Sequence, residues 1–384
     1  MAQIGEKEDA AKMGKKRKWP LCVLSAFILS AIVACSNHAN VQSATPPVSA
    51  SELPSANGGS GIDWNARIAL NKKAGKITYV TGFNYAASSP DVNAVVADEL
   101  GYFEKLGLNV KVVPGLDPDG MKLLSSGKAQ FASAGSASLV IQSVANGAEI
   151  KGIALMSQDG LGALMVLDDS GIRTPKDLEG KTVGYKGSLP SHFKAMFKNA
   201  GADLSKIEFV GVGFDPTILN TTDVDAVTVF KSNEPIAMND MGFGVRLIDP
   251  KDYGVPTSFG VVAANSKFLA SYPSAAEDFL RALFKAHEFI AANPDEAVSI
   301  LEGRSEMGYN AETEKNRLKA ELDIIADSRI AGKGLGWQTE EHWREEIEML
   351  ANTDSISRAV TADEAMDNRF ISPLYHGEEL IWIE

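Results

Sequence analysis

Residues 174–192 read TPKDLEGKTVGYKGSLPSH and indicate the kind of fold to which the chain belongs. Thr174 is a favourable helix cap and Pro175 suits the first helical turn, so a one-turn helix is expected. Lys181–Tyr185 then reads as a strand, and Gly187–Ser191 as a turn into the next helix. A helix start presents free N–H groups that can hold a carboxylate, phosphate, sulfonate or carbonyl oxygen. An ordinary strand-to-helix connection is the alternative interpretation.

The region before this stretch alternates strands with helices. Strands are expected at residues 76–80, 108–113 and 129–132, and helices at 92–100 and from 121 to the stop at Gly127. Alternation of this kind predicts a doubly wound α/β lobe, in which ligands bind beyond the carboxyl ends of the strands.

The first 34 residues have the features of a secretory signal peptide. A basic cluster, Lys15–Lys18, precedes an apolar run, Leu21–Ala34, that is too short to span a membrane comfortably. Ile32-Val33-Ala34-Cys35 is similar to a bacterial lipobox, so Cys35 is expected to be acylated and to become the mature N-terminus. A signal peptide without lipidation is the alternative.

Cysteine content and charge narrow the function classes. The only two cysteines are Cys22, in the removed segment, and Cys35, so the mature domain is expected to lack disulfides, a thiolate nucleophile and cysteine metal sites. Without residues 1–34 the chain has 31 Lys and Arg against 47 Asp and Glu, a net charge of −16. Such an acidic protein is unsuited to nucleic acid.

Residues 35–74 are expected to form a flexible tether after the acylated cysteine. This segment is rich in Ser, Ala, Pro, Asn and Gly and includes Asn57-Gly58-Gly59-Ser60-Gly61. With few large apolar residues, it cannot bury a core.

Several motifs together resemble the periplasmic solute-binding proteins of ABC importers. They are Gly101-Tyr102-Phe103 with Gly107-Leu108-Asn109-Val110, Leu123-Leu124-Ser125-Ser126-Gly127-Lys128-Ala129-Gln130-Phe131, Pro175–Gly184, Asp225-Ala226-Val227, Asn233-Glu234-Pro235 and Tyr253-Gly254-Val255-Pro256. The branch is the one that binds the thiamine pyrimidine precursor, nitrate, sulfonates and taurine. The resemblance covers about residues 76–303.

This resemblance implies a type II periplasmic binding protein fold, with two α/β lobes joined by two crossover strands. The expected crossovers are Ala163–Leu167 and Phe259–Ala264, both strand-like and apolar. Lobe 1 would then comprise residues 75–165 and 262–384, and lobe 2 residues 166–261.

A ligand site is expected where loops of both lobes meet. Phe83, Asn84 and Tyr85 would stack on and orient a flat ring. Asn233 and Glu234 would suit an aminopyrimidine, whereas Glu234 would repel a bare oxyanion. The candidate ligand-binding residues are Phe83, Asn84, Tyr85, Gly135, Ser136, Ser138, Tyr185, Gly187, Ser188, His192, Asn233 and Glu234.

Structural roles are the alternatives for several of these residues. Phe83 and Tyr85 would serve in the core, Ser136 as a helix cap, and His192 and Glu234 as polar residues at helix starts.

The expected function is therefore solute capture for an ABC importer. The thiamine-precursor subgroup usually has a tryptophan and a histidine in and after the first strand loop, which here reads Gly82–Ser89, so sulfonate, taurine, nitrate and flavin-type solutes remain alternatives. A pyrimidine-precursor synthase of the same fold carries a cysteine-rich segment that this chain lacks, so no catalytic residues are assigned.

The expected partners are a small-molecule solute, an ABC permease with its ATPase, and the membrane through the lipid anchor. We expect an exported monomer on the bacterial cell membrane, with no cofactor, no metal and no nucleic acid.

Replacing Cys35 tests the anchor. Cys35→Ala should yield a protein that is released in soluble form or kept as an unprocessed precursor, because a diacylated cysteine supplies most of the membrane affinity. Fractionation of cells expressing wild type and variant measures this. Membrane retention of a correctly cleaved Cys35→Ala protein would rule out lipidation as the anchor.

Overall fold

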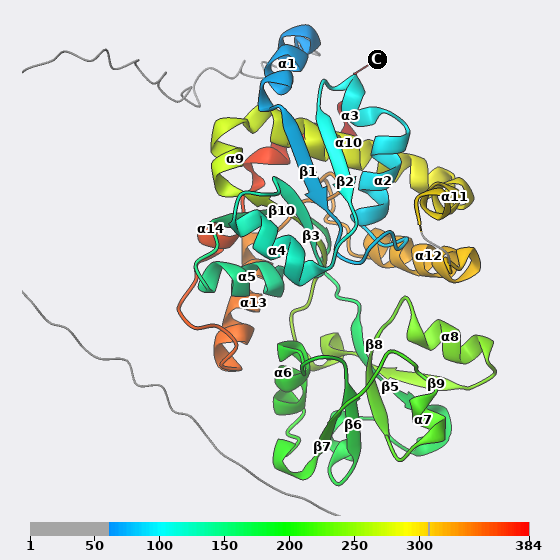
Figure 1. The fold of residues 1–384 in the computed structure, drawn as a ribbon. Coiled ribbons are helices and arrows are strands. Elements are labelled where there is room, and N and C mark those ends of the chain that lie inside the picture. The colour runs from blue at the N-terminus through cyan, green and yellow to red at the C-terminus, as the bar shows by residue number, and fades with distance from the viewer. Residues whose placement is uncertain (1–60, 306–307, 384) are drawn as a thin grey trace, which may run out of the picture. The chain divides into compact units, whose positions relative to one another are not determined.

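The computed structural model describes residues 61–305 and 308–383. These residues form two α/β lobes, each built on a five-stranded sheet, together with a small two-stranded ribbon (Figure 1). The strand order is β2-β1-β3-β10-β4 in the first lobe and β7-β6-β8-β5-β9 in the second. The two-lobed mixed α/β architecture predicted from the sequence is therefore confirmed.

The bounds of the elements follow the expected pattern closely. The first sheet contains β1 (Lys76–Val80), β2 (Asn109–Val113), β3 (Phe131–Ala134), β4 (Ile150–Ser157) and β10 (Phe259–Asn265). The second contains β5 (Gly162–Leu167), β6 (Thr182–Tyr185), β7 (Glu208–Gly211), β8 (Ala226–Phe230) and β9 (Val245–Ile248), and the ribbon is β11 (Tyr375–His376) with β12 (Glu379–Leu380).

Most helices belong to the first lobe. They are α1 (Trp64–Asn71), α2 (Asp91–Glu99), α3 (Tyr102–Lys105), α4 (Asp117–Ser125), α5 (Ala137–Ala145), α9 (Ser266–Ser271), α10 (Pro273–Ala292), α11 (Pro294–Arg304), α12 (Ala311–Asp327), α13 (Glu340–Asn352) and α14 (Ala362–Ala365). The second lobe has α6 (Ser191–Asn199), α7 (Ile218–Thr221) and α8 (Glu234–Asp240).

Strands β5 and β10 are full members of their sheets. β5 pairs antiparallel with β8 and β9, and β10 pairs antiparallel with β3 and β4. The chain passes between the lobes in residues 158–161, before β5, and again just ahead of β10. The expected lobe boundaries at 165/166 and 261/262 therefore fall inside these strands, and the sheets place them before residue 162 and before residue 259.

The strand pairing decides which edges of the two sheets are joined. Phe230 at the end of β8 lies opposite Gly162 at the start of β5, and Ser157 at the end of β4 lies opposite Phe259 at the start of β10. The passages thus join the carboxyl edge of the parallel strands in one lobe to the corresponding edge in the other. Loops that follow β1, β3, β6 and β8 consequently lie on the joined edges of the sheets.

Alternate side chains of the crossover strands β5 and β10 pack into three different apolar cores. In β10, Val262 and Ala264 face the core against α2 and α10, whereas Val261 and Ala263 face the core against α5 and α13. In β5, Leu164 and Val166 share this second core, while Ala163 and Met165 face a third core within the second lobe. The second core therefore extends from one lobe into the other.

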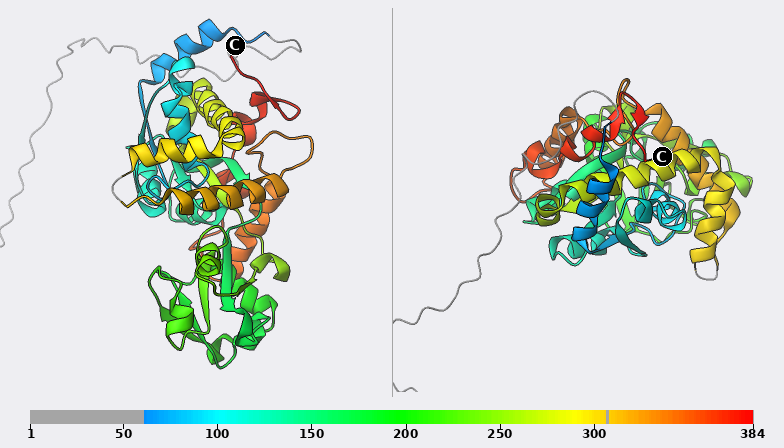
Figure 2. Two further views of the ribbon diagram at one scale, coloured as in Figure 1. Left: turned by 90° about the vertical axis from the view of Figure 1, so that its right-hand side faces the viewer. Right: turned by 90° about the horizontal axis from the view of Figure 1, so that it is seen from above.

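Helices α12 and α13 come from the end of the chain, beyond the residues that carry the family resemblance. Figure 1 shows α12 and α8 on one side of the molecule, and α13 above α6 on the other. Figure 2 shows α12 lying across the upper lobe on the face above α8. Trp343 of α13 is fully buried in the core that includes Phe193 of α6. Apolar packing therefore ties the lobes together along α13.

The segment that opened the sequence analysis has the expected structure. Pro175–Leu178 forms a single helical turn, capped by Thr174 with a reciprocal contact from Asp177. Strand β6 and helix α6 follow, and Phe193, Met196 and Phe197 are buried.

The expected tether is too long at its carboxyl end. Helix α1 begins after its cap Asp63, and Arg67 pairs with Asp278 of α10 at 2.7 Å. Trp64 packs against the first-lobe core. A tether reaching residue 74 is therefore corrected to one that ends before Asp63, because these residues bind to α10.

The predicted signal peptide (1–34), Cys35 and most of the tether lie outside the described residues. Among residues 61–305 and 308–383, the helices fall short of the length and apolar character that crossing a bilayer would require.

The centre of the first core can be tested with Phe279. Its ring stacks on Phe131 with centroids 4.0 Å apart, and it is fully buried. Phe279→Ala should lower the free energy of unfolding by about 3–5 kcal/mol because it removes these contacts and leaves a cavity. Phe214, which is 75% exposed, is the control, and Phe214→Ala should change stability by less than about 0.5 kcal/mol. Urea unfolding measures both, and equal effects would contradict this account of the core.

Candidate functional site

Two carboxyl groups, those of Asp91 and Asp117, lie at the edge of the first sheet where its parallel strands end. Asp91 accepts the N–H of Gly82 at 2.8 Å and that of Phe83 at 3.3 Å, and Asp117 accepts the N–H of Gly135 at 3.0 Å. A Cβ atom at Gly82 or Gly135 would clash with the Asp117 carboxyl, so a larger residue at either position would displace that carboxyl. Backbone donors that would otherwise be open to an anionic ligand are therefore occupied.

These carboxyl groups are held away from water. Burial raises the pKa of Asp91 to about 6, although the hydrogen bond from the Gly82 N–H lowers it in part. Burial and the neighbouring Asp91 charge raise the pKa of Asp117 to about 7. One oxygen of Asp117, Oδ1, is buried with no hydrogen-bond partner in the described part of the chain. This edge is thus unfavourable for an anion.

Large apolar side chains are exposed at the strand ends of both lobes. Phe83 follows β1 and is 50% exposed, and Leu116 follows β2 and is 44% exposed. In the second lobe Phe214 follows β7 at 75% exposure, and Phe230 ends β8 at 54%. Four of the eight exposed large apolar residues in the described chain occupy such positions, and exposed apolar side chains at strand ends are typical of binding sites.

The second lobe adds a buried ion pair beside this apolar surface. Glu234, the first residue of α8, accepts the N–H of Phe230 at 2.9 Å with one oxygen and pairs with Lys186 through the other. Lys186 also lies 5.6 Å from the centre of the Phe214 ring. Burial lowers the pKa of Lys186 to about 8. A polar group therefore stands next to a flat apolar face, an arrangement that suits a heterocycle.

Helix α12 connects the two lobes on this side. The Glu321 carboxyl accepts the hydroxyl of Ser88 at 3.0 Å and the N–H of Ser89 at 3.1 Å in the first lobe. It also accepts the hydroxyl of Ser232, at 3.1 Å, from the second lobe. Asn233 Oδ1 accepts a hydrogen bond from Arg317 of α12 at 3.2 Å. Burial raises the pKa of Glu321 to about 8.

The candidate residues predicted from the sequence fall into separate groups. Phe83, Asn233 and Glu234 lie with the exposed rings and α12, because Arg317 contacts both Phe83 and Asn233. Tyr185 ends β6, and Gly187 and Ser188 form the exposed turn after it.

The remaining candidates lie elsewhere. Ser138 donates to Glu346 of α13, and the Glu346 charge also acts on His192, whose pKa burial lowers to about 4. Ser136 is the cap residue of α5, after Gly135. In the first loop, the N–H of Asn84 donates to Gly115 O at 2.7 Å, and Tyr85 packs against the first-lobe core.

Sequence reasoning did not identify Phe214, Phe230, Lys186 or the α12 residues. Nothing in the sequence marks a phenylalanine as exposed, and Arg317 and Glu321 sit in an ordinary polar helix. The position of Phe230 at the end of a predicted strand, next to Asn233 and Glu234, was the one available signal.

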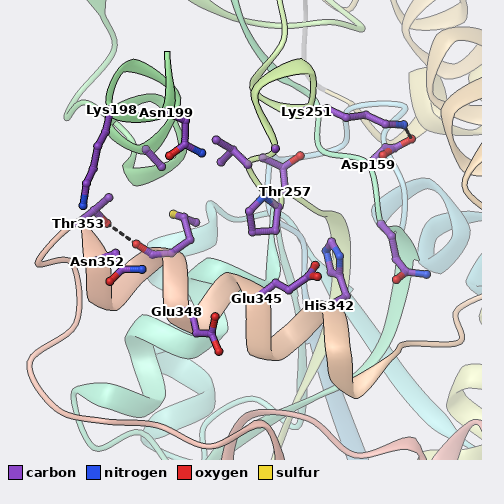
Figure 3. Close-up of a pocket in the computed structure, with 16 residues that line it drawn as sticks. Asp159, Lys198, Asn199, Lys251, Thr257, His342, Glu345, Glu348, Asn352 and Thr353 are labelled. Atoms are coloured by element: carbon purple, nitrogen blue, oxygen red, sulfur yellow. Dashed lines mark hydrogen bonds and ion pairs between the residues drawn. The ribbon is translucent and has the colours of Figure 1, made fainter. Parts of the chain in front are cut away.

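A cavity of about 530 Å³ lies on the other side, between α13 and α6 (Figure 3). Its lining includes Lys198 and Asn199 from α6 and Glu345 and Glu348 from α13. None of the candidate residues predicted from the sequence lines it. In the part of the chain that the structure describes, no group of three or more His, Cys, Asp and Glu residues is arranged to hold a metal ion.

Comparison with known proteins identifies a family and several related proteins. The family model described as NMT1/THI5 like matches residues 91–297. The formylaminopyrimidine-binding protein of Halalkalibacterium halodurans is 27% identical over 283 residues, which cover 71% of this chain and 84% of that protein. The riboflavin-binding protein RibY of Chloroflexus aurantiacus is 22% identical over 365 residues, covering 92% of this chain and 98% of that protein.

Solved structures show the same fold. The periplasmic aliphatic sulphonate binding protein SsuA from Escherichia coli has a TM-score of 0.60 at 15% identity, with 80% of this chain and 94% of that chain covered. Similar proteins also include a pyrimidine phosphate synthase, which is an enzyme.

Protonation of Glu321 should make stability depend on pH. A carboxyl group whose pKa is raised on folding stabilises most below its ordinary pKa near 4.5, and this contribution is lost as pH rises through about 8. Wild type should therefore lose free energy of unfolding relative to Glu321→Gln between pH 5 and pH 8.5. Urea unfolding at both values measures the difference. Glu312→Gln, an exposed change on the same helix, should follow wild type, and a pH-independent gap for Glu321→Gln would contradict the assignment.

Proposed function

Because the chain belongs to the NMT1/THI5-like family, we propose that it is the solute-binding component of an ABC importer. In this proposal a flat heterocyclic solute, similar to the pyrimidine precursor of thiamine, binds between the joined edges of the two lobes and is passed to a permease. Among the relatives, a formylaminopyrimidine-binding protein and a riboflavin-binding protein support a heterocycle.

The observation that carries this proposal is the exposure of Phe83 on one lobe and of Phe214 and Phe230 on the other. Leaving such rings in water is unfavourable, and a flat ligand stacked against them would remove them from it. The rings come from strand ends that the two passages place on joined edges. Closure of the lobes around a ligand would therefore bury rings from both sides.

The charges near the rings favour a heterocycle over a sulfonate or nitrate. Asp91 and Asp117 occupy the backbone donors of the first-lobe edge, and Glu234 adds a carboxylate in the second lobe. An anion would approach these carboxyl groups, while two cations near the rings, Lys186 and Arg317, are already paired with Glu234 and Glu314. Sulfonate, taurine or nitrate binding is thus the less favoured alternative.

An enzyme is the second candidate class, supported by the synthase among the similar proteins. A synthase would have to change its substrate covalently, so mass spectrometry of a recovered ligand would distinguish it from a binding protein. Unchanged ligand supports solute capture.

Export and anchoring complete the proposal. We place the protein outside the cytoplasmic membrane, held by a lipid on Cys35 and acting as a monomer with a permease and its ATPase. The basic cluster Lys15–Lys18, the apolar run Leu21–Ala34 and the lipobox ending at Cys35 support export and anchoring.

Ligand class can be tested through Glu234. A thermal-shift screen of the folded domain would use formylaminopyrimidine, riboflavin, taurine, an alkanesulfonate and nitrate, since a ligand at 100 Kd adds about 2.7 kcal/mol of stability. For a heterocycle, Glu234→Gln should weaken binding about tenfold or more, because the charged carboxylate that positions Lys186 and the Phe230 backbone beside the exposed rings is lost.

For a sulfonate or nitrate the same change should leave affinity equal or higher, because Lys186 is released from its partner. Calorimetric titration of wild type and Glu234→Gln measures both cases. Glu208→Gln, at an exposed position on β7, is the control and should bind like wild type. Tighter heterocycle binding by Glu234→Gln would sink the proposed role of this carboxylate.

A further inference from the structure

Helix α12 forms hydrogen bonds with the loop that contains Phe83, the exposed ring of the first lobe. Three of its residues at helical spacing, Glu314, Arg317 and Glu321, face the joined edges. Glu314 accepts the N–H of Ala87 at 2.7 Å, and Glu321 accepts from the neighbouring serines. The loop after Phe83 is thus fixed by the end of the chain, beyond residues 91–297 that match the family model.

Arg317 lies between candidate residues of both lobes. The centre of its guanidinium is 5.9 Å from the centre of the Phe83 ring, and one terminal nitrogen donates to Asn233 Oδ1 at 3.2 Å. The side chain is only 12% exposed. A flat solute bound between Phe83 and Asn233 would therefore approach this guanidinium.

The donors of Arg317 are not all used. A guanidinium has five N–H groups, and the structure gives it the Asn233 oxygen and an ion pair with Glu314 at 3.3 Å. Its Nε atom is buried and has no hydrogen-bond partner among the described residues. Buried donors are normally satisfied, so this nitrogen can donate to an acceptor that enters between Phe83 and Asn233.

A neutral acceptor suits Arg317 better than an anion does. Glu314 already balances the Arg317 charge, and Asp91 and Asp117 lie at the same edge of the first lobe. A carbonyl oxygen has two lone pairs, so it can accept from the guanidinium fork without adding charge, whereas a ring nitrogen has only one.

We infer that Arg317 is a specificity-determining residue that donates hydrogen bonds to a carbonyl-bearing edge of the bound heterocycle. This rests on the proposed solute-binding function and defines the substrate class further. The solute is planar, uncharged at this edge and carries an acceptor there.

Calorimetric titration of the mature protein tests the inference. The proteins are wild type, Arg317→Ala, Arg317→Lys and the control Lys315→Ala, which changes an exposed residue of the same helix. The probes are a formylaminopyrimidine, the same aminopyrimidine without its formyl group, and riboflavin. Circular dichroism melting confirms that each variant is folded, and Arg317→Lys provides a charged replacement should the alanine variant not fold.

We expect Arg317→Ala to lower the affinity for a carbonyl-bearing probe at least tenfold. Arg317→Lys should lower it at least threefold, because lysine keeps the charge but lacks the planar fork. For the probe without the formyl group, the Arg317 variants should lose less than twofold in affinity. Lys315→Ala should bind every probe as wild type does. Unchanged affinity in Arg317→Ala, or an equal loss for probes with and without the carbonyl, would overturn the inference while the proposed function stands. Absence of binding of every probe to wild type would overturn both.

Discussion

The arrangement of this protein depends on two strands that run against their neighbours. β5 and β10 each enter a sheet directly after the chain passes between lobes, and each pairs antiparallel on both sides. In a parallel strand arrangement the functional loops follow the carboxyl ends. Because the antiparallel strands begin at those same ends, the two loop-bearing edges are joined by the two short passages, and residues from both lobes are brought together.

The end of the chain adds a second set of connections, different in character on the two sides. Along α13 the contact includes one continuous apolar core that reaches from Trp343 to Phe193, next to the cavity lined by Lys198 and Glu345. Along α12 it is polar, made by Arg317 and Glu321 with Asn233 and Ser232. Apolar packing is close to all-or-none, whereas a few hydrogen bonds can exchange for water at little net cost. In the proposed closure of the lobes around a ligand, movement would therefore be easier on the α12 side, where the exposed rings lie.

Local signals in the sequence were sufficient to predict the positions of most strands and helices. Residues 245–248 and 163–167 read as strands because apolar and β-branched residues are concentrated there, and the cap at Thr174 follows from its own chemistry. Side-chain direction was harder to predict. His192 and Ser138 begin helices at the expected edges, yet their side chains lie near Glu346 of α13, a residue more than 150 positions away. Likewise, the environment of Arg317 is set by Phe83 and Asn233, which are distant in sequence.

The position of β10 has a consequence for how the molecule is assembled. In the first sheet β4 pairs with β10 alone, and β10 also separates it from β3. Strand β4 is almost entirely buried, but its partner is about a hundred residues later, after the whole second lobe. During synthesis the second lobe can form while the first-lobe sheet is still in two pieces. An unpaired, apolar strand edge persists throughout that interval, and such edges favour aggregation. The chain is thus most vulnerable to misassembly before residue 265 emerges, which makes this interval the one in which a chaperone would be of most use.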